Sequence, residues 1–73
     1  IYMIERSYIR RGDYILITDS RNDRYLQIGE IVEVQYYPHA SCVELYRVQF
    51  ADGICEYDDD LDYECKILMF GRY

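Results

Sequence analysis

Residues 43–57, VELYRVQFADGICEY, decide the fold of this 73-residue chain. Apolar and polar side chains alternate up to Phe50, which is the period of a β-strand with one buried face. The alternation places Tyr46, Val48 and Phe50 on one face, and we expect this face to point inward. Asp52-Gly53 then separates two apolar runs, which is a strong signal for a tight β-hairpin. Residues 54–57 are therefore expected to return as the partner strand.

Two further strands are expected on the N-terminal side of this hairpin. Residues 14–18, YILIT, have the β-branched and aromatic composition that strands favour. Residues 29–37 begin at a glycine and form the next strand. Strict alternation there places Val32, Val34 and Tyr36 on the core face and Ile31 and Glu33 on the other face. The polar residues 19–24 between the two strands are expected to form a loop.

The C-terminal side of the hairpin predicts a turn followed by a closing strand. Residues 58–61, three aspartates and Leu61, suit a single 3₁₀ turn with the leucine pointing inward. Residues 62–70 are expected to form the last strand. The first eleven residues are open to two interpretations, a short helix or an extra strand that pairs with the last strand, and we favour the strand.

This series of elements resembles the SH3-like barrel. The likeness rests on GDYILI at 12–17, IGEIVEV at 28–34, YRVQFADG at 46–53 and LDYE at 61–64. It is similar to the KOW-like branch of that fold and to small orphan proteins of bacteria and phages. The resemblance implies an all-β, five-stranded SH3-like barrel over residues 12–70, with an N-terminal extension at 1–11 and a tail at 71–73. The chain lacks the Trp of a polyproline groove, so we do not expect recognition of proline-rich peptides.

The charge of the chain is negative and uneven. Fourteen acidic residues oppose eight basic ones, and the formal net charge is −6. Five arginines fall within residues 1–25, whereas residues 26–73 hold ten acids against three bases. An acidic surface repels phosphate, so we expect no direct binding of nucleic acid. It suits a protein partner with a basic surface.

Composition also limits the class of protein. The chain is too short for an enzyme with a cleft between two domains, and its 51% hydrophobic residues exclude intrinsic disorder. No apolar run approaches the roughly 20 residues of a membrane span. We find no signal-peptide pattern and expect a cytoplasmic protein that does not associate with membranes.

No cofactor, metal or catalytic group is expected. His39 is the only histidine and follows Pro38 in a loop, with no base partner placed by spacing. The cysteines Cys42, Cys55 and Cys65 are odd in number, so we expect free thiols rather than a disulfide framework or a zinc site. The acids of residues 56–64 do not have the spacing of an EF-hand calcium loop.

We therefore predict a non-enzymatic binding protein. Exposed tyrosines beside acids make a good protein-binding surface, because tyrosine contributes large contact area at interfaces. The candidate partner-binding residues are Tyr36, Tyr37, Tyr57, Asp58, Asp59, Asp60 and Tyr63. A concrete version is an inhibitor encoded by a phage or mobile element, similar to some anti-CRISPR proteins, that mimics nucleic acid and blocks a nucleic-acid-binding site.

Two other functions stay open at this point. A KOW-like accessory domain would contact phosphate through the arginine-rich first third, with Arg10, Arg11, Arg21 and Arg24 as the phosphate-binding residues. A structural subunit would insert its barrel into a larger complex.

Overall fold

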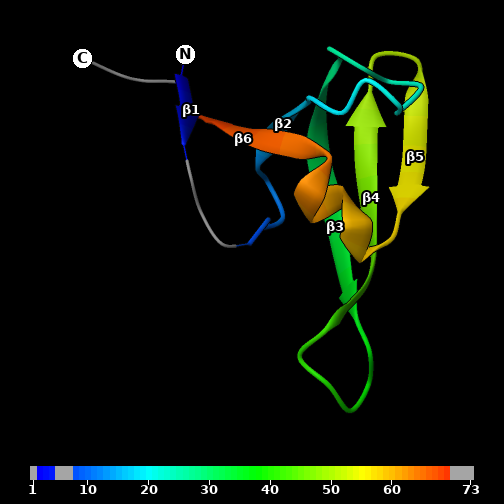
Figure 1. Ribbon diagram of the computed structural model, residues 1–73. Coiled ribbons are helices and arrows are strands. Elements are labelled where there is room, and N and C mark those ends of the chain that lie inside the picture. Colours follow the sequence, from blue (N-terminus) through cyan, green and yellow to red (C-terminus); the bar gives the residue numbers. More distant parts are fainter. Residues whose placement is uncertain (1, 5–7, 70–73) are drawn as a thin grey trace.

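The computed structural model describes residues 2–4 and 8–69 and contains one antiparallel β-sheet (Figure 1). The strands are β1 (Tyr2–Ile4), β2 (Tyr14–Ile17), β3 (Ile28–Tyr36), β4 (Val43–Phe50), β5 (Gly53–Tyr57) and β6 (Cys65–Met69). A 3₁₀ helix, η1 (Asp59–Tyr63), precedes the last strand. This confirms an all-β fold with a 3₁₀ turn before the last strand.

The strands are joined in the order β1-β6-β2-β3-β4-β5. For the N-terminal segment, the expected alternatives were a short helix and a strand that pairs with the last strand. The structure has the strand, because β1 pairs with β6. Figure 1 shows β1 and β5 on opposite sides of the molecule, and no pairing among the described residues joins them. The strand pairings thus show an antiparallel sheet and do not show its closure into a barrel. The expected tail at 71–73 lies outside the described residues.

The β4–β5 hairpin is present and tight. Phe50 pairs with Gly53, so the connection consists of Ala51 and Asp52. A turn centred on Asp52-Gly53 would have these two residues as its loop. The observed loop therefore lies one residue earlier in the sequence. Gly53 begins β5 with a φ of +149°, a conformation that side chains with a Cβ rarely adopt.

The core collects the inward faces of the strands and one residue of η1. Tyr46, Val48 and Phe50 are buried as expected, and Leu61 is the buried residue of η1. The remaining buried hydrophobic residues are Ile9, Ile15, Ile17, Ile31, Cys65, Ile67 and Leu68. The core thus lies between the sheet and η1.

The expected core face of β3 is wrong at both of its ends. Ile31 is completely buried, whereas Tyr36 is 55% exposed. The reason is two shifts of register between β3 and β4. Ile31 pairs with Val48, but the next paired residue is Glu33, so Val32 is the extra residue of a β-bulge. A second shift lies between Gln35 and Tyr36. The bulge brings Val34 back onto the core, where it packs against the buried cluster.

The last strand is shorter than expected. Residues 62–64 do not belong to it, because η1 continues to Tyr63 and the backbone N–H of Glu64 donates to the carbonyl of Leu61. Strand β6 begins at Cys65. In the described part of the chain, no helix is long and apolar enough to cross a membrane.

Candidate protein-binding surface

Three consecutive aspartates form the most compact group of acids at the start of η1. Asp58 is the N-cap residue, and its Oδ1 accepts a hydrogen bond of 3.0 Å from the backbone N–H of Asp60. Carboxylate oxygens of Asp58, Asp59 and Asp60 lie within 4.8 Å of one another, and all three residues are exposed. An aspartate N-cap explains why the helix begins here, and it forces the next two carboxylates into the same turn.

The charges of the neighbouring acids act on Asp60. The negative charge of Asp58 raises the pKa of Asp60 above its ordinary value, with smaller contributions from partial desolvation and from Asp59 and Glu64. A like charge nearby disfavours ionisation, which is the physical cause of this direction. The turn therefore presents a concentrated negative potential to solvent.

Three of the basic residues in the described segments form ion pairs with acids outside the three aspartates. Arg21 forms an ion pair with Asp19 at 2.9 Å, and Arg24 pairs with Asp52. Arg47 lies between Glu33 and Glu56 and bonds to both. Within residues 2–4 and 8–69, no arginine or lysine forms an ion pair with the three aspartates of η1. The negative charge of the chain is thus neutralised in several places and left unneutralised at η1.

The candidate tyrosines differ in exposure. Tyr63 is 86% exposed, and Tyr36 and Tyr37 are about half exposed, at 55% and 50%. Tyr57 is half-buried, because its ring packs edge-to-face against Phe50 with the ring centroids 6.4 Å apart. Three of the four tyrosines can therefore offer a large part of their rings to a partner.

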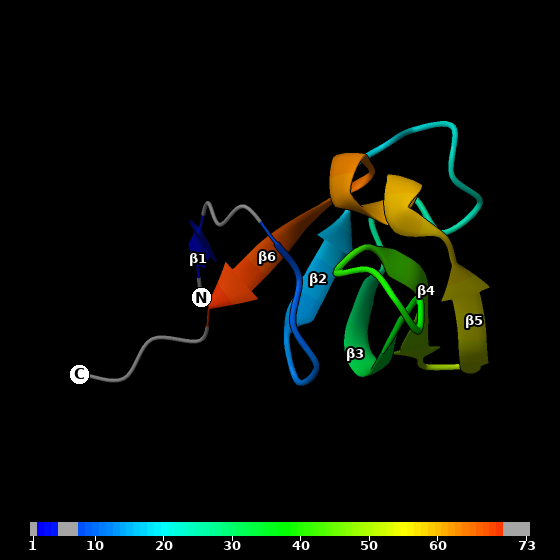
Figure 2. The ribbon, with the colours of Figure 1, turned by 90° about the horizontal axis from the view of Figure 1, so that it is seen from below.

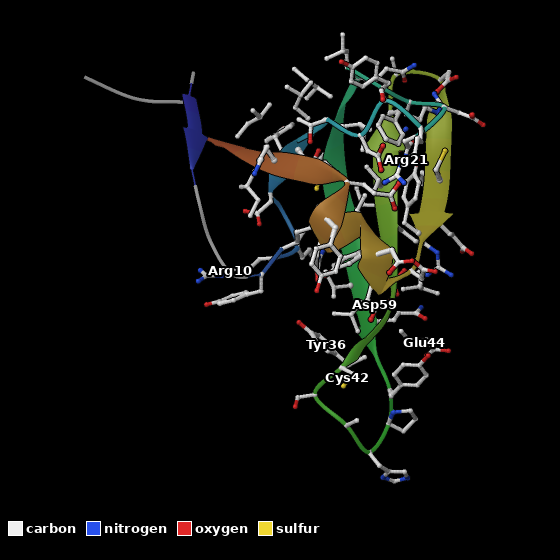
Figure 3. All side chains as sticks on the ribbon, viewed as in Figure 1. Arg10, Arg21, Tyr36, Cys42, Glu44 and Asp59 are labelled. Atoms are coloured by element: carbon white, nitrogen blue, oxygen red, sulfur yellow. The ribbon has the colours of Figure 1, made fainter. Side chains whose placement is uncertain are left out.

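The buried Tyr46, which sequence analysis placed on the inward face of its strand, connects η1 to the sheet. The hydroxyl of Tyr46 donates a hydrogen bond of 2.8 Å to Oδ1 of Asp62. Burial raises the pKa of Tyr46 well above its ordinary range, and Asp62 and Tyr36 add to the effect. Tyr36 lies two residues beyond Val34, which pairs with Tyr46, and Figure 3 shows it between Asp59 and the tip of the β3–β4 loop in that view. Tyr57, at the end of β5, leads directly into Asp58.

A hollow of about 440 Å³ lies beside η1, and we call it the η1 hollow. Its lining residues are Asp19, Arg21, Asp60, Tyr63 and Glu64. Backbone N–H groups of Thr18 and Asp19 donate to the Glu64 carbonyl at 2.9 and 3.2 Å, which holds the loop after β2 against η1 (Figure 2). Sequence analysis missed Asp19 and Glu64, because no local pattern shows that residues 45 positions apart meet.

The arginines of the alternative phosphate-binding site are not brought together. Figure 3 shows Arg10 and Arg21 far apart, with Arg10 beside the ring of Tyr8 at 4.7 Å from its centroid. Arg24 lies over the ring of Phe50, 4.9 Å from its centroid, in addition to its ion pair with Asp52. Arg11 is exposed and contributes to the lowered pKa of Glu33, after the hydrogen bonds from Gln35 and Arg47. The four arginines therefore do not form one basic patch.

The three cysteines are free and lie in different surroundings. Cys42 is exposed in the β3–β4 loop, and Cys55 is half-buried. Cys65 is buried, its Sγ lies 3.3 Å from the Leu61 carbonyl, and burial raises the pKa of its thiol to about 12. A buried thiol with a raised pKa is a poor nucleophile, so Cys65 serves packing.

Comparison of the chain with protein-family models, curated proteins and solved structures found no match. The fold and the surface around η1 define a small all-β protein with an antiparallel sheet and an acidic, tyrosine-bearing turn.

Proposed function

We propose that this chain is a non-enzymatic binding protein of the SH3-like type, which binds a protein partner with a basic patch. The binding surface is the η1 surface, defined by Tyr36, Tyr37, Tyr57, Asp58, Asp59, Asp60 and Tyr63. The proposal places the protein in the cytoplasm, where it needs no cofactor.

One observation carries this proposal: the three aspartates of η1 are exposed and have no ion-pair partner in the described part of the chain. Their mutual repulsion is partly relieved when a cation approaches, so a basic surface gains favourable Coulomb energy at this place. Complementary charge of this kind mainly increases the rate of association and the specificity of binding.

The tyrosines supply what charge alone does not. Tyr63, Tyr36 and Tyr37 expose half or more of their side chains. Tyrosine rings bury a large area at little cost in conformational entropy and are enriched among the residues that dominate binding energy. We therefore assign the association rate to the aspartates and the lifetime of the complex to the tyrosines.

A more specific version of the proposal is an inhibitor, encoded by a phage or mobile element, that occupies a nucleic-acid-binding groove. Such grooves are basic because they neutralise phosphates. The carboxylates of η1 would take the place of phosphates there. Small size, acidity and the resemblance to small phage proteins of this fold support this version.

The test begins with an affinity pull-down to obtain the partner, followed by association kinetics at several salt concentrations. The test variant is D58N/D59N, which keeps the N-cap oxygen and removes two charges. The control is E30Q, which removes a charge from β3 where Glu30 pairs with Gln49, beside the β4–β5 turn and away from η1. We expect D58N/D59N alone to slow association and reduce its salt dependence, because screening acts on the charges that remain.

Two results separate the proposal from its rivals. If D58N/D59N associates as fast as the wild type at low salt, the η1 surface is not the binding site. If the chain instead shifts DNA or RNA in a gel, and Arg10→Gln or Arg21→Gln abolishes the shift, the nucleic-acid alternative replaces this proposal. Tyr36→Ala is expected to accelerate dissociation and to leave association unchanged.

A further inference from the structure

The face of the sheet that points away from the core carries exposed apolar side chains. On β2, Ile15 and Ile17 belong to the buried core, so Tyr14 and Leu16 lie on the opposite face. Leu16 pairs with Ile28 of β3, and paired residues of antiparallel strands share a face. Tyr14 is 40% and Ile28 is 49% exposed, and Leu16 is half-buried. We call these three side chains the outer patch.

One further apolar residue lies next to the outer patch. The backbone N–H of Leu26 donates to the carbonyl of Ile17 at 2.8 Å, which holds Leu26 beside the end of β2. The side chain of Leu26 is 63% exposed, and its φ of +67° lies in the left-handed region that is unfavourable for a bulky residue. The fold therefore keeps this leucine exposed in spite of the backbone strain.

Two opposite charges lie at diagonal corners of the outer patch. Lys66 of β6 pairs with Leu16, and Glu30 of β3 pairs with Tyr14, so both charges share the face of the patch. Figure 2 shows β6, β2 and β3 side by side. Two strand spacings and a step of two residues separate the Cα atoms of Lys66 and Glu30 by roughly 12 Å. In the described part of the chain, neither residue forms an ion pair.

This arrangement is complementary to itself. A two-fold interface brings the same patch of both subunits together, so a contact between two residues occurs twice. When two copies stack on this face, with the axis in the plane of the interface midway between Lys66 and Glu30, each Lys66 faces Glu30 of the partner subunit. The two charges of the patch cancel, so the net charge of −6 opposes association only from a distance, where salt screens it.

We propose that the outer patch is the interface of a homodimer, in which Lys66 of each copy pairs with Glu30 of the other. The apolar side chains form the centre of this interface, and the two ion pairs set its register. The patch is small beside the roughly 20–30 residues per side of a standard interface, so the dimer is weak and forms at high protein concentration. It contains no residue of the η1 surface and is independent of the proposed function.

Sedimentation velocity of the 73-residue chain at increasing concentration, up to about 1 mM, tests for the dimer. The buffer contains about 0.15 M salt to screen the net charge. We expect the average mass to rise from 8.9 kDa towards twice that value. A chain that stays monomeric at the highest concentration overturns the inference.

Charge reversal tests the predicted contact between the copies. Lys66→Glu and Glu30→Lys each place like charges at both corners, and each should weaken self-association about tenfold. An equimolar mixture of the two variants should dimerise as the wild type does, because opposite charges then face each other at both corners. Mixing cannot repair a misfolded chain, so this rescue separates the contact from a structural effect. A mixture that dimerises no better than its components overturns the inference.

An apolar variant tests the centre of the patch. Ile28→Thr keeps the branched side chain that strands favour and should weaken the dimer about tenfold. Ile54→Thr is the matched control, because Ile54 is 56% exposed but lies on β5, two strands beyond Glu30. A dimer that survives Ile28→Thr, or that is lost in Ile54→Thr, has a different interface and overturns the inference. Association with the protein partner is measured far below these concentrations, where the chain is monomeric, so D58N/D59N and its control E30Q test the proposed function separately.

Discussion

Replacing Gly29 by alanine tests how closely β3 lies against the core. Gly29 is buried, and a Cβ at this position would lie 2.5 Å from Cγ1 of Val48 and 2.9 Å from Cε1 of Phe50. Ordinary van der Waals contacts begin at 3.4 Å. Both neighbours are themselves buried, so neither can move away into solvent. The alanine methyl must therefore push core atoms apart.

The expected cost follows from overpacking. One extra methyl in a well-packed core destabilises by about 1–3 kcal/mol. Val48→Ala alone should cost about 2–3 kcal/mol, through lost burial and a cavity. The double variant Gly29→Ala/Val48→Ala removes the atom that makes the worst contact. It should therefore be more stable than the sum of the two single costs predicts, by about 0.5–3 kcal/mol.

Urea unfolding followed by circular dichroism measures these free energies. Gly12→Ala is the matched control, because Gly12 has a φ of +92° and an added Cβ there meets nothing within 4 Å. Its cost is backbone strain of about 1–2 kcal/mol, which Val48→Ala cannot relieve. The free-energy costs of Gly12→Ala and Val48→Ala are therefore expected to add. If the costs of Gly29→Ala and Val48→Ala add as well, the close approach of β3 to the core is refuted.

The remaining predictions test the core, the thiols and the charges. Phe50→Ala should lower the free energy of unfolding by about 3–5 kcal/mol, and a wild-type melting curve would contradict the inward position of this ring. A thiol reagent should label Cys42 first and Cys65 last, and added reductant should leave the melting temperature unchanged; a large drop would indicate a disulfide. The pKa of Cys65 is raised from 9.0 to about 12, so the stability that this thiol contributes is complete below pH 9 and is lost as the pH rises towards 12. Cys65→Ala should remove part of that alkaline loss of stability. An unchanged alkaline profile in this variant would count against burial of the thiol. Asp60→Asn should raise stability slightly, because the raised pKa of Asp60 means that the folded state favours its neutral form; a loss of stability would contradict this.

Local patterns in the sequence predicted much of the fold. The hairpin follows from alternation up to Phe50 and from the turn residues after it, and all of this information lies within residues 43–57. The position of Leu61 follows in the same way from a short acidic turn. Each of these features depends on neighbours along the chain, which is why sequence analysis found them.

The features that sequence analysis missed depend on pairing between strands. No local pattern marks Val32 as an extra residue, because apolar and polar side chains alternate along its strand as they do along the other strands. The bulge appears only when β3 is aligned with β4, where Ile31 and Glu33 pair with consecutive residues. The η1 hollow was missed for the same reason, since its two sides come from segments far apart in the chain.

Strand register also explains why the acidity of the chain is concentrated at η1. The sequence shows only that residues 26–73 have a large excess of acids. In the sheet, Arg47 pairs with Glu33 on β3 and with Glu56 on β5, so one cation serves two carboxylates in a single row. Arg24 is bound in the same manner at the hairpin, by Asp52. These ion pairs weaken the negative potential over the sheet. Among the described residues, the three aspartates at η1 have no such ion pair. Under the proposed function, this distribution of charge would orient a basic partner towards η1 before contact.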